Sequence, residues 1–229
     1  MTEAMDNSER SVPDAPSPPH LIAVEGPIGV GKTSLARRLA DSFNYDILLE
    51  KPEENPFLER FYSNPRQHAL ATQLFFLFQR SRQISELRQD DLFRPVRVTD
   101  FLIEKDHLFA RQNLDADEFR LYEQVYAHLT LDTPRPDLVI YLQAPTPVLL
   151  NRIRKRGIAA EQQIEADYLE RLNAAYTEFF HYYEQSPLLI VNSADIDLVN
   201  NEDDYRQLLE QILSAPQGTH YFNPGPRLI

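Results

Sequence analysis

The sequence predicts an α/β domain in which a parallel sheet of five strands is flanked by helices. Short runs of β-branched and apolar residues alternate with longer amphipathic segments, which is the pattern of repeated βα units. Several of these runs are continuously apolar instead of alternating, as expected for strands covered by helices on both faces. The chain has 229 residues, of which 42% are hydrophobic. This content is sufficient for a buried core.

The expected strands are bounded by turn residues and cover five ranges: 21–25 (LIAVE), 45–50 (YDILLE), 96–100 (VRVTD), 138–143 (LVIYLQ) and 188–192 (LLIVN). The expected helices lie between and after them, at 32–43, 67–88, 118–129, 147–154, 165–184 and 202–213. Neither a linker nor an internal repeat divides the chain. We therefore expect residues 20–229 to form a single domain.

The two ends of the chain differ from this pattern. Residues 1–19 are rich in proline, serine and acidic residues and poor in apolar ones, which predicts a disordered tail. The C-terminal stretch GTHYFNPGPRLI contains turn residues and aromatic rings. We expect it to pack as an extended segment.

The composition excludes several classes of protein. The chain contains no Cys, which excludes a disulfide scaffold, a Cys-type zinc site and a cysteine nucleophile. The net charge of −12 and the pI of about 4.9 argue against a nucleic-acid-binding surface. No apolar run approaches the ~18–20 residues that a membrane span needs, and the N-terminus lacks the pattern of a secretory signal. We expect a cytoplasmic protein.

The most specific motif is a glycine-rich loop that reads G-x-x-x-x-G-K-T from Gly26 to Thr33. It follows a predicted strand and opens a predicted helix, the context in which such a loop holds the phosphates of a nucleotide. Lys32 is expected at the β- and γ-phosphates, and the hydroxyl of Thr33 at Mg²⁺. The predicted nucleotide-binding residues are Gly26, Pro27, Ile28, Gly29, Val30, Gly31, Lys32, Thr33 and Ser34.

The loop alone does not determine the reaction, because GTPases, motor ATPases and small-molecule kinases share it. The N-K-x-D signature of guanine recognition is absent from the sequence. The chain is also short for an ATPase that remodels other proteins. These two observations favour the kinase of a small acceptor.

Two predicted strands end in acidic residues, Glu50 and Asp100. In open parallel sheets, ligands bind at the carboxyl ends of the strands. Glu50 can serve as general base for an acceptor hydroxyl, and Asp100 can hold Mg²⁺ directly or through water. The alternative is that both are solvated turn residues.

A basic cluster, RIRKRG at 152–157, ends one predicted helix. We expect a mobile lid over about residues 152–163, whose arginines neutralise the transferring phosphoryl group. The alternative is an ordinary interaction of cations with a helix C-terminus.

The long predicted helix carries Gln79, Gln83 and Glu86 along one face. The amide of Gln79 can pair with the edge of a nucleobase or with another helix. The phenylalanines of the same helix are expected in the core.

Four segments together resemble the deoxyribonucleoside kinases, and in particular the bacterial deoxyadenosine/deoxyguanosine kinase branch. They are IAVEGPIGVGKTSLARRLA, the stretch ENPFL that follows Glu50, PDLVIYLQAPTPVLLNRIRKRG and DYLERLNAAY. The resemblance covers about residues 20–213. It implies a P-loop kinase fold with a five-stranded parallel sheet and a short lid, assembled as a homodimer. It also implies transfer of the γ-phosphoryl of ATP to a nucleoside 5′-hydroxyl.

The resemblance also implies roles for individual residues. Glu50 matches the general base and Gln79 the glutamine that reads the base. Arg152 and Arg156 match the lid arginines, and Glu161 matches the acid that receives the sugar 3′-hydroxyl.

The chain departs from the family at several positions. After the third strand the family has an acid-Arg-Ser triplet, whereas here Asp100 is followed by Phe101. A second lid arginine is replaced by Ile158. The base-reading Arg and Asp of the family fall, in an ungapped alignment, on Glu86 and Lys105, which would reverse both charges.

The sequence thus predicts an ATP- and Mg²⁺-dependent kinase of deoxyribonucleosides in nucleotide salvage, with a preference for purines. The expected substrate-binding residues are Glu50, Gln79, Glu86, Asp100, Lys105 and Glu161, and the expected metal ligands are Thr33 and Asp100. One alternative is the kinase of a different small acceptor, such as a nucleoside monophosphate or a vitamin-precursor alcohol. The other is a nucleotide-binding regulator that has lost turnover.

Overall fold

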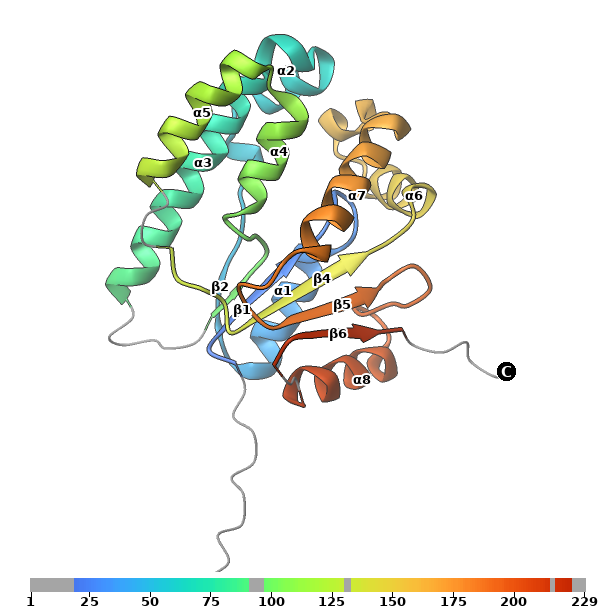
Figure 1. Ribbon diagram of the computed structural model, residues 1–229. Coiled ribbons are helices and arrows are strands. Elements are labelled where there is room, and N and C mark those ends of the chain that lie inside the picture. The colour runs from blue at the N-terminus through green and yellow to red at the C-terminus, as the bar shows by residue number, and fades with distance from the viewer. Residues whose placement is uncertain (1–18, 91–96, 130–132, 215–216, 224–229) are drawn as a thin grey trace, which may run out of the picture.

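The computed structural model describes residues 19–90, 97–129, 133–214 and 217–223, and of residues 86–90 it describes the backbone only. A parallel sheet of six strands lies at its centre, in the order β2-β3-β1-β4-β5-β6 (Figure 1). The strands are β1 (Leu21–Glu25), β2 (Asp46–Leu48), β3 (Arg97–Thr99), β4 (Leu138–Gln143), β5 (Leu188–Asn192) and β6 (Thr219–Phe222). Because β1 lies between β3 and β4, the glycine-rich loop that follows it starts in the middle of the carboxyl edge of the sheet.

The sixth strand corrects the prediction of five. It comes from the C-terminal stretch, where Thr219 to Phe222 pair in parallel with Leu188 to Val191 of β5. The Phe222 side chain is buried and the Tyr221 side chain is exposed, as the alternation of a strand at the edge of a sheet requires. Four residues are too short a run to predict a strand from the sequence alone. They form one here because the edge of β5 provides backbone hydrogen-bonding partners.

The helices follow the predicted order, with two additions. They are α1 (Lys32–Phe43), α2 (Leu58–Ser63), α3 (Pro65–Asp90), α4 (Lys105–Asn113), α5 (Ala116–Leu129), α6 (Thr146–Arg156), α7 (Ala166–His181) and α8 (Glu202–Leu213), with 3₁₀ helices η1 (Pro52–Glu54) and η2 (Ala159–Gln163). The short helices α2 and α4 were not predicted, because neither is long enough for its apolar periodicity to stand out.

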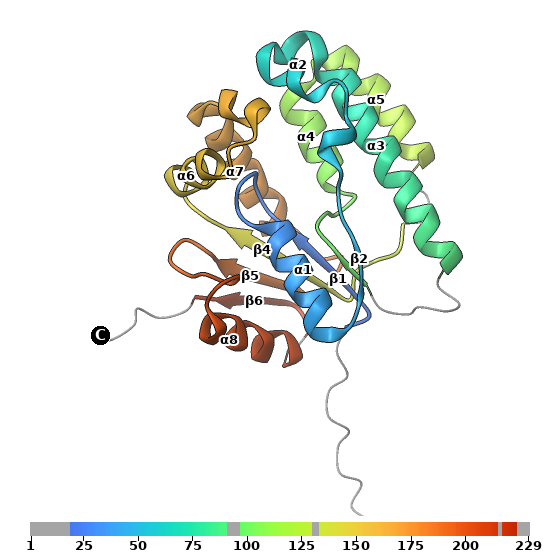
Figure 2. The same ribbon diagram turned by 180° about the vertical axis from the view of Figure 1, so that it is seen from behind.

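Helices cover both faces of the sheet. On one face α1 and α8 lie side by side (Figure 2), and the Tyr205 hydroxyl of α8 donates a hydrogen bond to the Arg38 carbonyl of α1 at 3.0 Å. On the other face α7 packs on β4, where the rings of Tyr141 and Phe180 stack with centroids 4.1 Å apart. This double cover explains the continuously apolar strands.

The carboxyl edge of the sheet lies between two groups of helices. Helices α3, α4 and α5 form a bundle on the β2 side, and α6 and α7 lie on the β4 side (Figure 1). The glycine-rich loop is between these groups (Figure 2). No helix within the described residues combines the length and the apolar character of a membrane span. The predicted disordered tail, 1–19, falls almost entirely outside the described residues.

Candidate active site

The glycine-rich loop has the conformation of an anion-binding site. Gly31, with φ of +107°, precedes α1 and adopts a backbone conformation that side chains disfavour. At Gly26 a Cβ atom would lie 2.5 Å from the Leu142 carbonyl oxygen, so only glycine allows this approach to β4. The N-terminus of α1 receives no side-chain cap. Its N–H groups and its dipole are therefore available to phosphate oxygens.

Lys32 bends back over this loop. Its Nζ donates to the carbonyl oxygens of Gly26 and Pro27 at 2.8 and 3.3 Å. Burial, followed by the nearby Lys105, lowers the pKa of Lys32 from its usual value. An anionic phosphate in the loop would oppose this shift, because it favours the charged ammonium.

Asp100 connects the glycine-rich loop to Glu50. Its Oδ2 accepts a hydrogen bond from the Thr33 hydroxyl at 2.5 Å, and its Oδ1 accepts one from the Glu50 backbone N–H at 2.7 Å. Burial and the nearby Glu50 raise the pKa of Asp100. The Thr33 hydroxyl and the Asp100 carboxylate are adjacent oxygen donors at the phosphate loop. They fit the ligand preference of Mg²⁺, which binds proteins through few carboxylates and fills its other positions with water and phosphate.

Two cavities meet at the loop. The first, of about 140 Å³, is lined by Glu50, Lys32 and Thr33 together with Tyr62, Gln73 and Phe76. The second, of about 520 Å³, is lined by Gly31, Ser34 and Arg152 together with residues 196–200. Gly29 and Arg156 line both. This shared boundary is where a group could pass from a ligand in one cavity to a ligand in the other.

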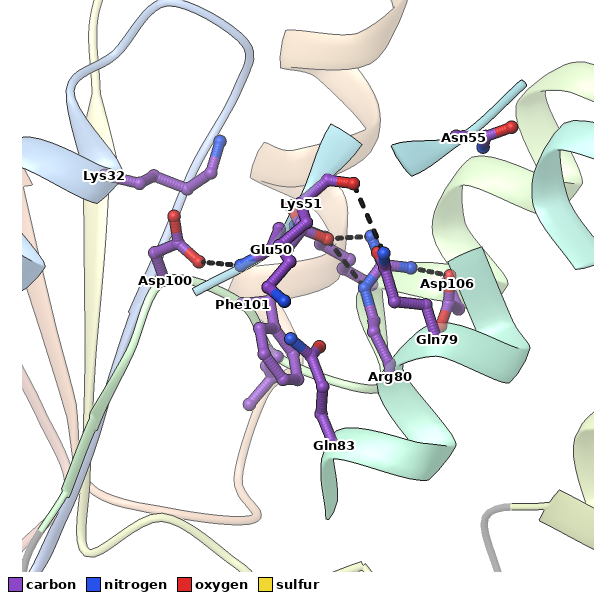
Figure 3. Close-up of polar contacts among 12 residues, drawn as sticks. Lys32, Glu50, Lys51, Asn55, Gln79, Arg80, Gln83, Asp100, Phe101 and Asp106 are labelled. Carbon is purple, nitrogen blue, oxygen red and sulfur yellow. Dashed lines mark hydrogen bonds and ion pairs between the residues drawn. The ribbon is translucent and has the colours of Figure 1, made fainter. Parts of the chain in front are cut away.

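Glu50, two residues beyond β2, is held by two cations in the first cavity. Its Oε1 accepts from Arg80 Nε at 2.7 Å (Figure 3). Its Oε2 accepts from Lys105 Nζ at 2.8 Å. Burial alone would raise the pKa of Glu50, but Arg80 and Lys105 lower it to about 2. The carboxylate is therefore ionised at neutral pH.

Arg80 is a site residue that the sequence analysis missed. Its side chain, on α3, is 6% exposed, and it forms ion pairs with Glu50 on one side and with Asp106 of α4 on the other. Asp106 is fully buried, its Oδ2 makes no hydrogen bond to the described residues, and burial raises its pKa. The pair thus leaves one carboxylate oxygen of Asp106 unsatisfied, and its partner Arg80 lines the first cavity.

The structure places Gln79 outside the first cavity. Its amide donates to the Lys51 carbonyl at 3.2 Å and to Glu54 at 3.1 Å (Figure 3), and it does not line the first cavity. One turn further along α3, the Gln83 amide donates to the Leu49 carbonyl at 2.8 Å. The two amides thus hold the segment around Glu50 against α3.

The glutamine that lines the cavity is Gln73. It is buried, and its amide has no hydrogen-bond partner among the described residues. Gln73 and Arg80 are seven residues apart, as are Gln79 and Glu86. The spacing alone could not distinguish these two pairs. Phe76, expected in the core, lines the same cavity.

Of the two positions at which a charge reversal is predicted, Glu86 and Lys105, the structure describes the side chain of Lys105 only. Lys105 contacts Glu50 and lies 3.6 Å from Glu25. The side chain of Glu86 lies outside the part of the chain that the structure describes. Arg80, which lines the first cavity, pairs with Asp106, and this pair has the signs of the Arg and Asp to which the resemblance assigns base reading.

The predicted lid residues occupy two places. Arg152 lies in the second cavity, where it donates to the Ser193 carbonyl at 2.6 Å and to the Val30 carbonyl at 3.2 Å. Arg156 lies at the boundary of the two cavities and forms an ion pair with Glu161, which lines the first. Gln163 accepts a hydrogen bond from Ser63 of α2 at 2.8 Å. This bond connects η2 to α2, a helix that lines the first cavity.

The sequence model of the deoxynucleoside kinases matches residues 22–215, a span that includes both cavities. The chain belongs to the deoxynucleoside kinase family. This kinase is thus a phosphotransferase with a nucleotide-binding loop, and a deoxynucleoside is its acceptor.

Named relatives of the kinase cover most of its length. It is 34% identical to a deoxyguanosine kinase of Bacillus subtilis over 83% of this chain and 95% of that protein. It is 30% identical to a deoxyadenosine kinase of Lactobacillus acidophilus, over 84% and 94% of the two chains. The solved structure of deoxyadenosine kinase from M. mycoides with bound dATP has a TM-score of 0.73 at 26% identity, and it covers 83% of this kinase and 99% of that chain.

Proposed function

We propose that this kinase transfers the γ-phosphoryl group of ATP to the 5′-hydroxyl of a purine deoxynucleoside in nucleotide salvage. The observation that carries the proposal is the meeting of the two cavities at Gly29 and Arg156. ATP would occupy the second cavity with its phosphates in the glycine-rich loop. The deoxynucleoside would occupy the first, with its 5′-hydroxyl at Glu50.

In the proposed reaction the 5′-oxygen attacks the γ-phosphorus while its proton passes to Glu50. The bond from the γ-phosphorus to the oxygen that bridges it to the β-phosphorus breaks, and ADP leaves. Lys32 and Arg156 neutralise the charge on the transferring group. Such a reaction needs alignment and charge compensation more than covalent chemistry.

Mg²⁺ would be held by Thr33 and Asp100, and it would neutralise phosphate charge when bound. The hydrogen bond from the Glu50 N–H to Asp100 supports a structural connection between the proposed metal ligands, Thr33 and Asp100, and the proposed general base, Glu50. In this proposal Asp100 serves the metal and Glu50 takes the acceptor proton.

Gln73, Arg80 and Asp106 are the proposed base-reading residues, in place of Gln79, Glu86 and Lys105. The Gln73 amide and the unsatisfied Asp106 oxygen offer the donor and acceptor groups that read the edge of a base. The preference for purines is supported by the relatives named deoxyguanosine and deoxyadenosine kinases. Glu161, held by Arg156, would receive the sugar 3′-hydroxyl.

A coupled assay for ADP release, run with each of the four deoxynucleosides, tests the proposal. Deoxyguanosine or deoxyadenosine should give the highest kcat/KM, and EDTA should abolish turnover. Phosphorylation of a nucleoside monophosphate with no deoxynucleoside activity would replace the proposed acceptor. Binding of ATP without turnover of any acceptor would identify a regulator.

We also propose a cytoplasmic homodimer, as the resemblance implies. The exposed apolar side chains of Phe78 on α3 and Leu121 on α5 support an interface on this bundle. Sedimentation equilibrium should give twice the mass of 26.6 kDa. A monomer at micromolar concentration would contradict the homodimer without affecting the reaction.

A further inference from the structure

We propose that Lys105 is the positioning residue of the general base, in the place of the arginine that Phe101 replaces. The inference rests on the proposed function, because it assigns Lys105 a role in the same reaction. Phe101 itself cannot supply a cation. Its ring is buried, and it packs in an apolar cluster with Leu77 and Tyr122.

Lys105 lies four residues after Phe101, at the first turn of α4. Its side chain is 4% exposed, and lysine is almost never buried to this extent unless it is paired. Nζ lies 2.8 Å from Glu50 Oε2 and 3.6 Å from Glu25 Oε2. The ammonium of Lys105 thus reaches the Glu50 carboxylate from the start of α4, although Phe101, the residue after Asp100, has no charge.

Glu25 gives this lysine a fixed anchor. The Glu25 carboxylate is fully buried and accepts hydrogen bonds from the Gly26 N–H at 2.8 Å, the Leu102 N–H at 2.9 Å and the Tyr176 hydroxyl at 2.9 Å. These bonds come from the glycine-rich loop, from the segment before α4 and from α7. The ammonium is therefore positioned relative to the phosphate loop as well as to Glu50.

The two cations on Glu50 are not equivalent. Arg80 also pairs with Asp106, whereas Lys105 also pairs with Glu25, whose carboxylate accepts the Gly26 N–H of the glycine-rich loop. A lysine ammonium has three donors. The hydrogen bond to Glu50 accounts for one of them, and Glu25 at 3.6 Å is an ion-pair partner beyond hydrogen-bond distance, so two donors have no hydrogen-bond acceptor among the described residues. We expect one of these two donors to contact the oxygen that Glu50 deprotonates, so that Lys105 orients the base and the attacking oxygen together.

The test compares Lys105→Ala, Lys105→Arg and a control, Lys51→Ala, in the ADP-release assay. Lys51 follows Glu50 in the sequence, and its half-exposed side chain pairs with Glu54 on the surface. Lys105→Ala should lower kcat by about 10²-fold, the scale of a lost positioned donor, with the KM for ATP changed less than about threefold. Lys105→Arg should regain at least a tenth of the lost activity, and Lys51→Ala should behave as the wild type.

Chemical rescue separates positioning from structural support. Ethylamine at high concentration should raise the kcat of Lys105→Ala several-fold and leave Lys51→Ala unchanged, because a small ammonium ion can occupy the vacated space. Thermal melting shows whether the variants fold. If Lys105→Ala does not fold, Lys105→Gln replaces it in the kcat measurement with the same expected loss, and recovery by Lys105→Arg then takes the place of the ethylamine test.

A wild-type kcat in the folded Lys105→Ala or Lys105→Gln variant would overturn the inference. So would a loss of kcat that neither arginine nor ethylamine restores. If the wild-type protein itself phosphorylates no deoxynucleoside, the proposed function fails, and this result differs from a failure of the Lys105 variants alone.

Discussion

The two halves of the site are constructed in different ways. The phosphate half consists of nine consecutive residues, 26–34, whose backbone N–H groups and glycine conformations form the binding surface. The acceptor half consists of side chains from the loop after β2 and from α2, α3, α4 and η2, with Glu50 and Asp106 separated by 56 residues. One half is local in the sequence, and the other exists only after the chain has folded.

This difference determines how each half responds to change. In the phosphate half the backbone provides most of the contacts, so side-chain substitutions there are informative mainly at Lys32 and Thr33. In the acceptor half Glu50 depends on Arg80, Lys105, Gln79 and Gln83. We therefore expect substitutions to reduce kcat by graded amounts, from complete loss of phosphoryl transfer to a few-fold loss where the position of Glu50 shifts slightly.

The largest effect is expected for Lys32→Ala. Among the described residues the ammonium donates hydrogen bonds only to loop carbonyls, so its removal should leave the fold intact while phosphoryl transfer falls below detection. Circular dichroism and the ADP-release assay measure the two properties. Turnover similar to that of the wild type would contradict the assignment of the glycine-rich loop.

Glu50→Gln tests the acceptor half. The variant should lower kcat by about 10²–10⁴-fold with the affinity for ATP nearly unchanged, because a general base acts on the acceptor proton. Isothermal titration with a non-hydrolysable ATP analogue measures the affinity. If ATP affinity is lost instead, Glu50 belongs to the metal site and its role must be exchanged with that of Asp100.

A matched pair, Gln73→Ala and Gln79→Ala, tests which face of α3 reads the base. Gln73 lines the cavity and Gln79 binds the Lys51 carbonyl. Gln73→Ala should raise the KM for the deoxynucleoside by about 10-fold, the scale of one lost hydrogen bond in a buried site. Gln79→Ala should change this KM less than about threefold. The opposite ranking would restore Gln79 as the base-reading residue.

The smallest effect is expected for Gln83→Met. This change removes the hydrogen bond to the Leu49 carbonyl and keeps the length of the side chain. Loss of one such bond should lower the stability by about 1 kcal/mol and kcat by a few-fold, with the KM for ATP unchanged. Chemical denaturation and steady-state kinetics measure these changes. An unaltered kcat would show that the segment around Glu50 holds its position without this bond.

The order in which site residues could be predicted follows the same division. The loop 26–34 could be assigned from the sequence because its contacts depend on neighbouring residues and on the strand and helix that flank it. Glu50 and Asp100 could be assigned to the site because the carboxyl ends of parallel strands meet at one edge. Arg80 and Asp106 gave no local signal, since a charged residue within a helix is most often a solvated one.

The sequence by itself determined the parallel α/β fold, the phosphate loop and the acidic residues at the carboxyl edge, because hydrophobic period and glycine spacing act over a few residues. Only the tertiary structure decided that Gln73 instead of Gln79 faces the cavity, that Arg80 pairs with Asp106, that Lys105 contacts Glu50, and that residues 219–222 add a sixth strand. Each of these depends on how a helix is rotated about its axis or on a contact between residues far apart in the sequence. A charged side chain can be buried without a large loss of stability only where an oppositely charged partner lies within hydrogen-bond distance.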